Sequence, residues 1–238
     1  MLARTGSVYL IRGSLFHQGL AHYYQRKIEV LAGNDPEQWL PWRAAVAAQA
    51  DAEGAGWLHE IPLVTEAIED YLRHWSQDGW KPLLVEYELR AQVKHPTKPG
   101  ERFLYTQRAD LIVEDKDQRV WIVDHKTASR IAGRTLAQHT LSGQMIGYQH
   151  FGRALYGERF AGVLLNRVKL QAPQEYDRRP VQPAPWAVRN FIKTLQWAEQ
   201  VDDMTPMDPD LAPMAVHQSV CYGSYGACDA HDLCRFGT

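Results

Sequence analysis

The first third of the chain has the residue pattern of helices. The stretch Ser14–Ala32 predicts a helix with Ser14 as its N-cap. Gly33 and Asn34 would end it, because both residues adopt the left-handed backbone of a helix C-terminus with little strain. Residues 36–79 continue the helical pattern in two or three pieces. The breaks between these pieces are expected at Pro41, Gly54, Gly56 and Pro62.

The centre of the chain changes to the pattern of strands. Residues 83–93 (LLVEYELRAQV) alternate between apolar and polar and predict a strand, and residues 95–101 (HPTKPGE) predict a turn. The apolar runs 111–113 (LIV) and 120–123 (VWIV) flank the polar segment EDKDQR. Residues 102–127 therefore predict a β-hairpin with a short charged turn.

After the hairpin we expect a helix, a strand and a second helix. They span residues 135–156, 160–170 and 186–201, with an irregular Pro-rich stretch at 171–185. Residues 202–238 have little periodic signal. Because there is no internal repeat and no long linker, we expect a single domain over residues 1–238, with 202–238 as a Cys-containing tail. The order of elements predicts an α/β or α+β fold.

Composition and charge narrow the class of protein. The 238 residues are 45% hydrophobic and 23% charged, which suits one large folded domain. No apolar run reaches membrane-spanning length and no signal peptide is visible, so we expect a soluble, cytoplasmic protein. The net charge of −2 argues against a nucleic-acid binder, but residues 126–200 carry 11 Lys and Arg against 4 Asp and Glu. That basic block could hold a phosphate backbone, although solvated helix faces would give the same pattern.

Two aspartates and a lysine in the hairpin carry the main chemical signal. We expect Asp110 at the head of the first strand, and Asp124 and Lys126 at the end of the second. Because Asp124 and Lys126 are two residues apart, their side chains point to the same face of a strand. Two carboxylates and a lysine that converge can hold a divalent metal ion and activate a water molecule beside it. A surface hairpin with solvated charges would show the same residues.

The hairpin resembles motifs II and III of the PD-(D/E)xK nucleases, in particular their RecB-like exonuclease branch. The matching segments are Ala109–Val113 (ADLIV) and Ile122–Thr127 (IVDHKT). The resemblance implies a restriction-endonuclease-like α/β core, with a mixed central sheet flanked by helices. It also implies that Asp110, Asp124 and the backbone carbonyl of His125 bind Mg²⁺ or Mn²⁺. Lys126 would then orient the attacking water or stabilise charge on the phosphate.

The same resemblance gives roles to a pair on the following helix. Gln144 and Tyr148 are four residues apart, so both side chains face one way. A Q-x-x-x-Y helix in the RecB-like branch lines the active site, which implies that Gln144 positions the substrate or the catalytic groups and that Tyr148 contacts a DNA strand. Without the resemblance, an ordinary packed pair explains these residues equally well.

Two further site residues follow from the resemblance. Gly13 and His17 match the G-x-x-x-H of the branch, whose histidine completes the metal site, and an imidazole ligand shifts preference toward Mn²⁺. A histidine in an apolar helix is otherwise usually a packing residue. Glu86 or Glu88 resembles the catalytic glutamate of the first strand, and we prefer Glu86 because it directly follows the apolar run.

All three cysteines lie in the tail. Cys221, Cys228 and Cys234 have the spacing C-x6-C-x5-C, which resembles the C-terminal part of the four-cysteine iron–sulfur site in some members of this branch. The chain is one Cys short of that site. A truncated start, a lost cluster, or a non-Cys ligand such as His231 would each explain the difference.

These observations predict a metal-dependent DNA nuclease that hydrolyses phosphodiester bonds, with exonuclease action on single-stranded or end-containing DNA. Stand-alone members of this size in the RecB-like branch occur in phages and in CRISPR adaptation, so we expect the cytoplasm of a bacterium or a phage-infected cell and partners in recombination, repair or CRISPR adaptation. The alternative is a catalytically silent DNA-binding or partner-docking subunit of a recombination complex. No GxxxxGK[ST] motif is present, so we expect no helicase motor in this chain.

Overall fold

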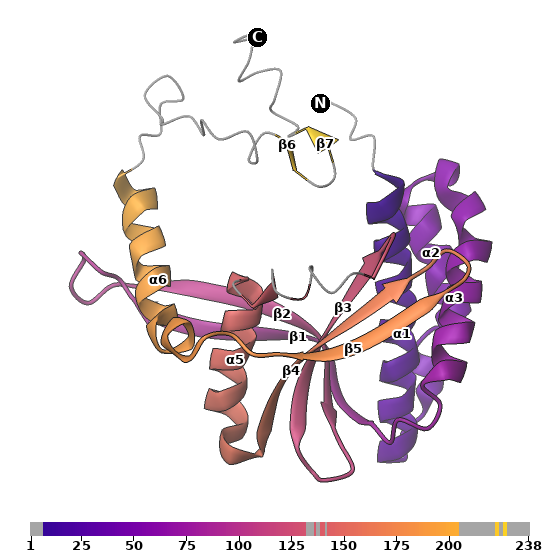
Figure 1. Cartoon of the computed structure of the whole chain (residues 1–238), viewed down its shortest axis with the longest axis horizontal. Helices are drawn as coiled ribbons and strands as arrows, with labels where there is room; N and C mark the ends of the chain where they lie inside the picture. The colour runs from indigo at the N-terminus through magenta and orange to yellow at the C-terminus, as the bar shows by residue number, and fades with distance from the viewer. Residues whose placement is uncertain are drawn as a thin grey trace.

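A five-stranded mixed sheet forms the centre of the protein (Figure 1). The structure is a computed structural model that describes residues 7–131, 136, 139–140, 142–204, 222–223 and 226–227. The strands, in their order across the sheet, are β1 (Lys81–Lys94), β2 (Arg102–Glu114), β3 (Val120–Ala128), β4 (Phe160–Lys169) and β5 (Glu175–Val181). Neighbouring strands are antiparallel except β3 and β4, which run parallel. A parallel pair needs a crossover, and the chain between β3 and β4 includes a helix that supplies it.

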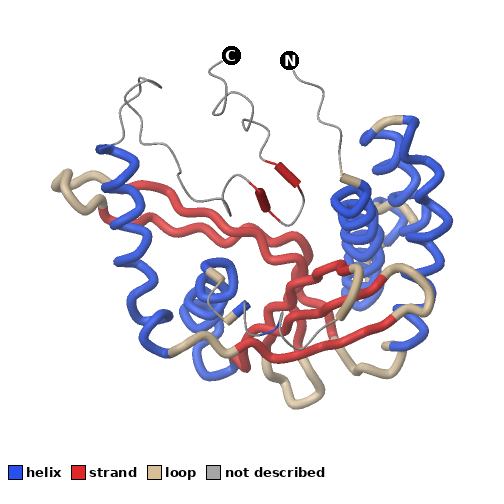
Figure 2. Tube along the Cα trace, turned by 45° about the horizontal axis from the view of Figure 1, so that its top comes forward, coloured by secondary structure: helices blue, strands red, loops and turns tan. Residues whose placement is uncertain are grey.

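Helices lie on both sides of this sheet (Figures 1 and 2). On one side are α1 (Val8–Ala32), α2 (Trp42–Glu53) and α3 (Ile61–His74), joined by the 3-10 helices η1 (Pro36–Gln38) and η2 (Ala55–Glu60). On the other side are α5 (Gly143–Tyr156) and α6 (Pro185–Met204), and the 3-10 helix η3 (Gly157–Arg159) joins α5 to β4. The short strands β6 (Tyr222–Gly223) and β7 (Gly226–Ala227) pair with each other.

Alternation along the strands produces two hydrophobic cores, one on each face of the sheet. Leu111 and Val113 of β2 pack with α1, α2 and α3, whereas Ile112 between them packs with α5 and α6. In β3, Val123 and Ile122 divide between the two cores in the same way. Successive side chains of a strand point to opposite faces, so a sheet covered on both sides has nearly continuous apolar strands. The predicted α/β fold, a mixed sheet flanked by helices, is confirmed.

Several predicted boundaries were wrong. Helix α1 begins at Val8, so Ser14 lies inside it, and its hydroxyl bonds Glu53 and Gln49 of α2 instead of capping the helix. The break expected at Pro62 is present between η2 and α3, and Pro62 lies in the first turn of α3, where proline needs no N–H partner. Strand β2 begins at Arg102, which places Asp110 well inside the strand and not at its head.

The predictions for residues 135–185 were partly wrong as well. Helix α5 begins at Gly143, and most of residues 132–141, where the predicted helix was to start, lie outside the described residues. The stretch 171–185 contains β5, which was not predicted. It is an edge strand, where proline residues such as Pro180 are tolerated. Among the described residues, no helix combines the length and apolar character needed to cross a membrane.

Candidate active site

Strands β2 and β3 stop pairing at the two aspartates predicted from the sequence. Their last backbone pair on that side is Leu111 with Val123, so Asp110 and Asp124 come next, one on each strand, where the strands part. The N–H of His125 loses its ladder partner there and donates to Asp110 Oδ2 at 2.7 Å. The carboxylate of Asp110 thus replaces a backbone acceptor and holds the separated strands in register.

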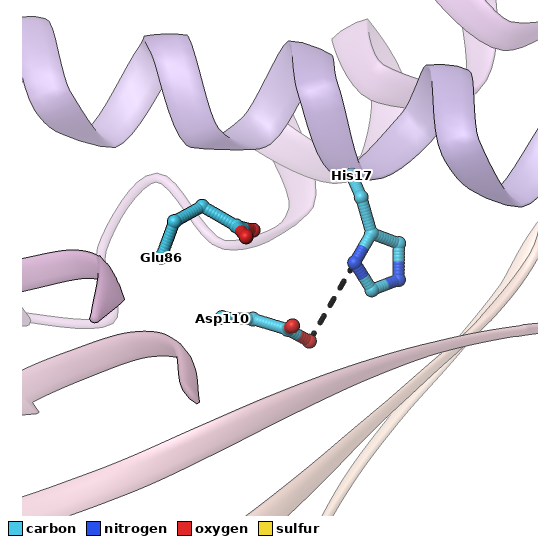
Figure 3. Close-up of side chains that lie close together, drawn as sticks. All are labelled: His17, Glu86 and Asp110. Carbon is cyan, nitrogen blue, oxygen red and sulfur yellow. Dashed lines mark ion pairs between the residues drawn. The ribbon is translucent and has the colours of Figure 1, made fainter. Parts of the chain in front are cut away.

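Helix α1 and strand β1 bring two more side chains to Asp110. Nδ1 of His17 lies 3.6 Å from Asp110 Oδ2, and Glu86 points into the same space (Figure 3). One ligand atom from each of the three residues lies within 4.8 Å of the other two. Glu86 and Asp110 face each other across the β1–β2 ladder, between the pairs Val85–Leu111 and Tyr87–Ala109. We call His17, Glu86 and Asp110 the front cluster.

Glu86 reaches the front cluster through an unusual backbone. Its φ is +48°, a left-handed value that is rare for a residue other than glycine and costs conformational energy. Glu88, the other candidate on this strand, is exposed and pairs with Arg90 at 2.5 Å. The structure therefore places Glu86, not Glu88, beside Asp110. Its side chain also lies 3.0 Å from Nε of Arg108.

The two carboxylates of the front cluster concentrate negative charge, which Arg108 offsets in part at Glu86. Burial acts to raise the pKa of Asp110, but the hydrogen bond and charge of His17, together with the His125 N–H, lower it to about 2. Burial and the charge of Asp110 raise the pKa of Glu86. Burial acts to lower the pKa of His17, and the carboxylates overcome it and raise that pKa. The cluster therefore attracts a cation, either a proton on His17 or a metal ion.

Lys126 and Asp124 form a second group beside the front cluster. Lys126 Nζ donates to Asp124 Oδ1 at 3.2 Å and to Gln144 Oε1 at 3.1 Å. It also lies 3.0 Å from Asp124 Oδ2, but that buried oxygen has no well-directed hydrogen bond. Burial raises the pKa of Asp124 to about 6, with repulsion by Asp110 opposing the attraction of Lys126. A carboxylate with an unbonded buried oxygen has a lone pair available for a further ligand.

Tyr148 holds Gln144 in place from inside the protein. Its hydroxyl accepts from Gln144 Nε2 at 3.0 Å and donates to the backbone carbonyl of Arg108 at 2.5 Å. The side chain is fully buried. The expectation that Tyr148 contacts a DNA strand is therefore wrong for this structure, because both the ring and the hydroxyl are enclosed by protein. Gln144 contacts both Lys126 and Tyr148, so the side chains of Gln144 and Tyr148 point the same way, as their helical spacing predicted.

Behind the aspartates, the ring of His125 is part of a buried polar network. Its Nδ1 accepts from Asn166 Nδ2 at 2.7 Å, because Asn166 is its direct neighbour on β4. Arg178 Nε donates to Asn166 Oδ1 at 3.2 Å, which fixes the orientation of that amide. Burial lowers the pKa of His125 to about 3, so the ring is neutral. The ring therefore supports the backbone that connects Asp124 to Lys126 without adding charge.

Arg178 anchors this network, which we call the back network (His125, Asn166 and Arg178). Its guanidinium carbon lies 3.8 Å from the ring centre of Trp75 and 3.7 Å from that of Trp80. It also donates to Asp78 Oδ2 at 2.8 Å. Sequence reasoning missed both Asn166 and Arg178. Two arginines side by side in a Pro-rich stretch gave no sign of which one is buried.

A cleft of about 580 Å³ opens over the front cluster. Besides the front cluster, Arg108 and Lys126, its lining includes Tyr9 and Leu10 of α1, both about half exposed. Gly13 lies on this wall, where an added Cβ would come within 3.1 Å of Thr127 Oγ1. The glycine of the G-x-x-x-H pattern thus allows α1 to approach β3 and brings His17 to Asp110. The predicted cysteines, Cys221, Cys228 and Cys234, lie outside the described residues, as does His231.

Comparison with known proteins gives a family and a fold. The family model described as the PD-(D/E)XK nuclease superfamily matches residues 4–235. The crystal structure of a "Putative exonuclease" from Eubacterium rectale superposes with a TM-score of 0.50 at 9% identity, covering 93% of this chain and 82% of that one. At that identity the likeness concerns the fold alone. The structure of SSO0001 has a TM-score of 0.36 at 15% identity, covering 82% of this chain and 76% of its own. No curated protein matches.

Proposed function

The chain belongs to the PD-(D/E)XK nuclease superfamily, and from that premise we propose that it is a metal-dependent deoxyribonuclease of the RecB-like branch, acting as an exonuclease on single-stranded DNA ends. The observation that carries the proposal is the front cluster: His17, Glu86 and Asp110 converge to within 4.8 Å in an open cleft, with Lys126 in the lining of the same cleft. A metal-dependent phosphodiester hydrolase needs such a set of ligands and a nearby cation.

The donor set fits a divalent metal ion. Two carboxylates and one imidazole offer hard oxygen ligands and one nitrogen, a combination that suits Mg²⁺ or Mn²⁺ and is improved for Mn²⁺ by the imidazole. The low pKa of Asp110 keeps that ligand ionised. The unbonded oxygen of Asp124 and the carbonyl of His125 are the further ligands we propose. A metal ion held there would acidify a bound water and offset negative charge on the phosphate.

The protein's own groups position the reaction. The side chain of Lys126 is 37% exposed, while its ammonium is held by Asp124 and Gln144. In that position it orients the attacking water or stabilises charge that develops on the phosphate. Gln144 keeps the ammonium in place, and Tyr148 keeps Gln144 in place. Such a chain of supports limits the motion of a flexible lysine, which is how a positioned catalytic group gains its effect.

The form of the cleft supports an unpaired strand as substrate. Its volume of about 580 Å³ is in the range of small-ligand pockets, so it accommodates a strand end more readily than a duplex. Tyr9 and Leu10 offer apolar surface to bases, and Arg108 offers a cation to a phosphate. The family match over residues 4–235 supports the proposal that the chain is one nuclease domain, with the cysteine-containing tail as an appendage.

The test is cleavage of end-labelled single-stranded DNA by the purified full chain. We expect activity with Mg²⁺ or Mn²⁺, none with EDTA, and a loss of about 10²–10³-fold in Lys126→Ala. Lys116→Ala is the matched control, because Lys116 is exposed in the β2–β3 turn away from the cleft. If the chain binds DNA but the labelled strand stays intact both with and without added metal, the protein is the catalytically silent subunit of the alternative prediction.

A further inference from the structure

The outer face of α6 carries two exposed tryptophans. Trp186 and Trp197 are 60% and 67% exposed, whereas Ala187 and Phe191 are buried, and Phe191 packs with α5 in one of the two hydrophobic cores. The two tryptophans are 11 residues apart, which is about three helical turns, so they lie on the same side of the helix. Two indoles exposed on one side of a helix leave large apolar surfaces available to a partner.

Two cations lie between these tryptophans. Arg189 and Lys193 are exposed on the same side of α6, and within the described part of the chain neither has a carboxylate partner. Residues 185–198 contain no Asp or Glu. The acidic residues of α6 come after this stretch, and Asp203 is engaged by Lys98, whose Nζ lies 2.8 Å from its Oδ1. The face therefore presents two positive charges between two indoles. We call Trp186, Arg189, Lys193 and Trp197 the α6 stripe.

We propose that the α6 stripe binds single-stranded nucleic acid, with the indoles stacking on unpaired bases and the two cations contacting phosphates. Stacking platforms combined with positive charge are how proteins hold single strands without reading their sequence. The stripe is about 16 Å long, enough for roughly five stacked nucleotides at ~3.4 Å each. Tryptophan and arginine also occur in protein interfaces. Here the indoles are separated by unpaired cations, and this charge favours a polyanion over a protein partner.

The α6 stripe is a site separate from the cleft. Helix α6 packs on α5, whose first turn carries Gln144, and none of the four residues lines the cleft. This inference rests on the proposed function in one respect, which is that the bound strand is single-stranded DNA. It adds a second contact, which holds the strand away from the bond that is cut. Binding there can be measured in EDTA, so its failure and a failure of the proposed hydrolysis are distinguishable.

The experiment measures binding of a fluorescein-labelled, mixed-sequence single-stranded oligodeoxynucleotide to the full chain in EDTA. We expect the double substitution Trp186→Ala with Trp197→Ala to weaken binding at least about tenfold, since base stacking on one aromatic side chain contributes a factor of about 5–150. The matched variant Trp186→Phe with Trp197→Phe keeps an aromatic ring at both positions and should restore most of the affinity. Duplex DNA of the same sequence should bind equally well to all three proteins, because its bases are not free to stack.

The cations are tested by the salt dependence of the same binding. Arg189→Gln with Lys193→Gln should reduce the slope of log K against log salt by about 1.4, at ~0.7 for each phosphate contact on a single strand. Lys116→Gln is the control and should leave the slope unchanged. Unchanged affinity in the double Trp→Ala protein would overturn the proposal. So would equal losses for single-stranded and duplex DNA, or a loss of self-association in that variant, which would assign the stripe to a second copy of the chain.

Discussion

The front cluster and the back network lie on either side of the same short segment, Asp124–Lys126, and differ in almost every physical respect. The front cluster lines an open cleft, and its carboxylates repel one another. In the back network, Asn166 is fully buried and Arg178 is 7% exposed, and each polar group has a partner: His125 with Asn166, Asn166 with Arg178, and Arg178 with Asp78.

The difference shows how one fold holds a reactive site. Carboxylates that repel each other are unfavourable for folding, and they persist only when the surrounding structure compensates. Part of the compensation is local, because His17 and the His125 N–H lower the pKa of Asp110. The rest is at the back, where the cation of Arg178 is held between two tryptophans and connected by hydrogen bonds to the strand that carries the site. Changes at the front should therefore affect chemistry most, and changes at the back should affect stability most.

The largest effect is expected at the front, in Asp110→Asn. The variant loses an ionised ligand, so we expect DNA cleavage to fall by about 10³-fold, measured under single-turnover conditions. Its stability should fall too, since a carboxylate whose pKa is lowered to about 2 stabilises the fold above its unfolded pKa. The shift corresponds to about 2 kcal/mol at neutral pH. Cleavage within a few-fold of the unchanged protein would remove Asp110 from the site.

The next effect is expected at the back, in Arg178→Met. Removing one partner of a buried ion pair leaves Asp78 and Asn166 without their donor, which should cost about 3–5 kcal/mol of unfolding free energy. The neighbouring Arg179→Met is the control, because Arg179 is 61% exposed in its pair with Asp177, and its loss should cost less than about 1 kcal/mol. Urea unfolding followed by circular dichroism measures both. Equal losses of unfolding free energy in the two variants would show that Arg178 and its network stabilise the fold no more than an exposed ion pair does.

Asp124 lies in the segment between the two regions, and Asp124→Asn tests a pH dependence of stability. The folded pKa of Asp124 is raised to about 6, so its stabilising contribution is full below the unfolded pKa near 4 and is lost as pH rises through 6. In the absence of metal, the free energy of unfolding of the unchanged protein should therefore fall by up to about 3 kcal/mol as the pH rises through this range. The Asp124→Asn variant should not show this fall. The measurement is the difference between the two stability curves from pH 4 to 8. Parallel curves would show that folding does not raise the pKa of Asp124.

The smallest effect is expected in Tyr148→Phe. The change leaves the carbonyl of Arg108 without its buried donor and Gln144 without one partner, so we expect a loss of about 1–2 kcal/mol in stability. Cleavage should fall several-fold, because Gln144 then holds Lys126 less firmly. Gln144→Ala should reduce cleavage by a similar factor with little change in stability. Because both act through Lys126, their effects on cleavage should not add in the double variant.

The sequence predicted the front of the site better than the back, for a physical reason. Asp110, Asp124 and Lys126 interrupt apolar strands, and a charge at the edge of such a run is visible without a structure. Glu86 was preferred over Glu88 for the same reason, but its place beside His17 depends on a left-handed backbone at Glu86, which no spacing rule predicts. Asn166 and Arg178 depend on which strands become neighbours, and that is a property of the whole sheet.

The predicted secondary structure shows the same contrast between local sequence signals and pairing that depends on the whole sheet. The hairpin and strand β4 were predicted well because alternation and apolar runs are local signals. Strand β5 was missed because its prolines and charges are those of a loop, and only pairing with β4 makes it a strand. The start of α1 was misplaced because Ser14 has the chemistry of a cap but uses its hydroxyl to contact α2.

The parallel pairing of β3 with β4 ties the reactive segment to residues about forty positions later in the chain. His125 pairs with Asn166 only after the crossover through α5 has closed, whereas β1, β2 and β3 can pair through short turns. Such a pairing closes a loop of about forty residues, which costs more chain entropy than a short hairpin turn does. A chain emerging from the ribosome would thus assemble its hairpins before β4 supports the segment between Asp124 and Lys126. The order of synthesis itself would keep the nascent protein inactive until the fold is nearly complete.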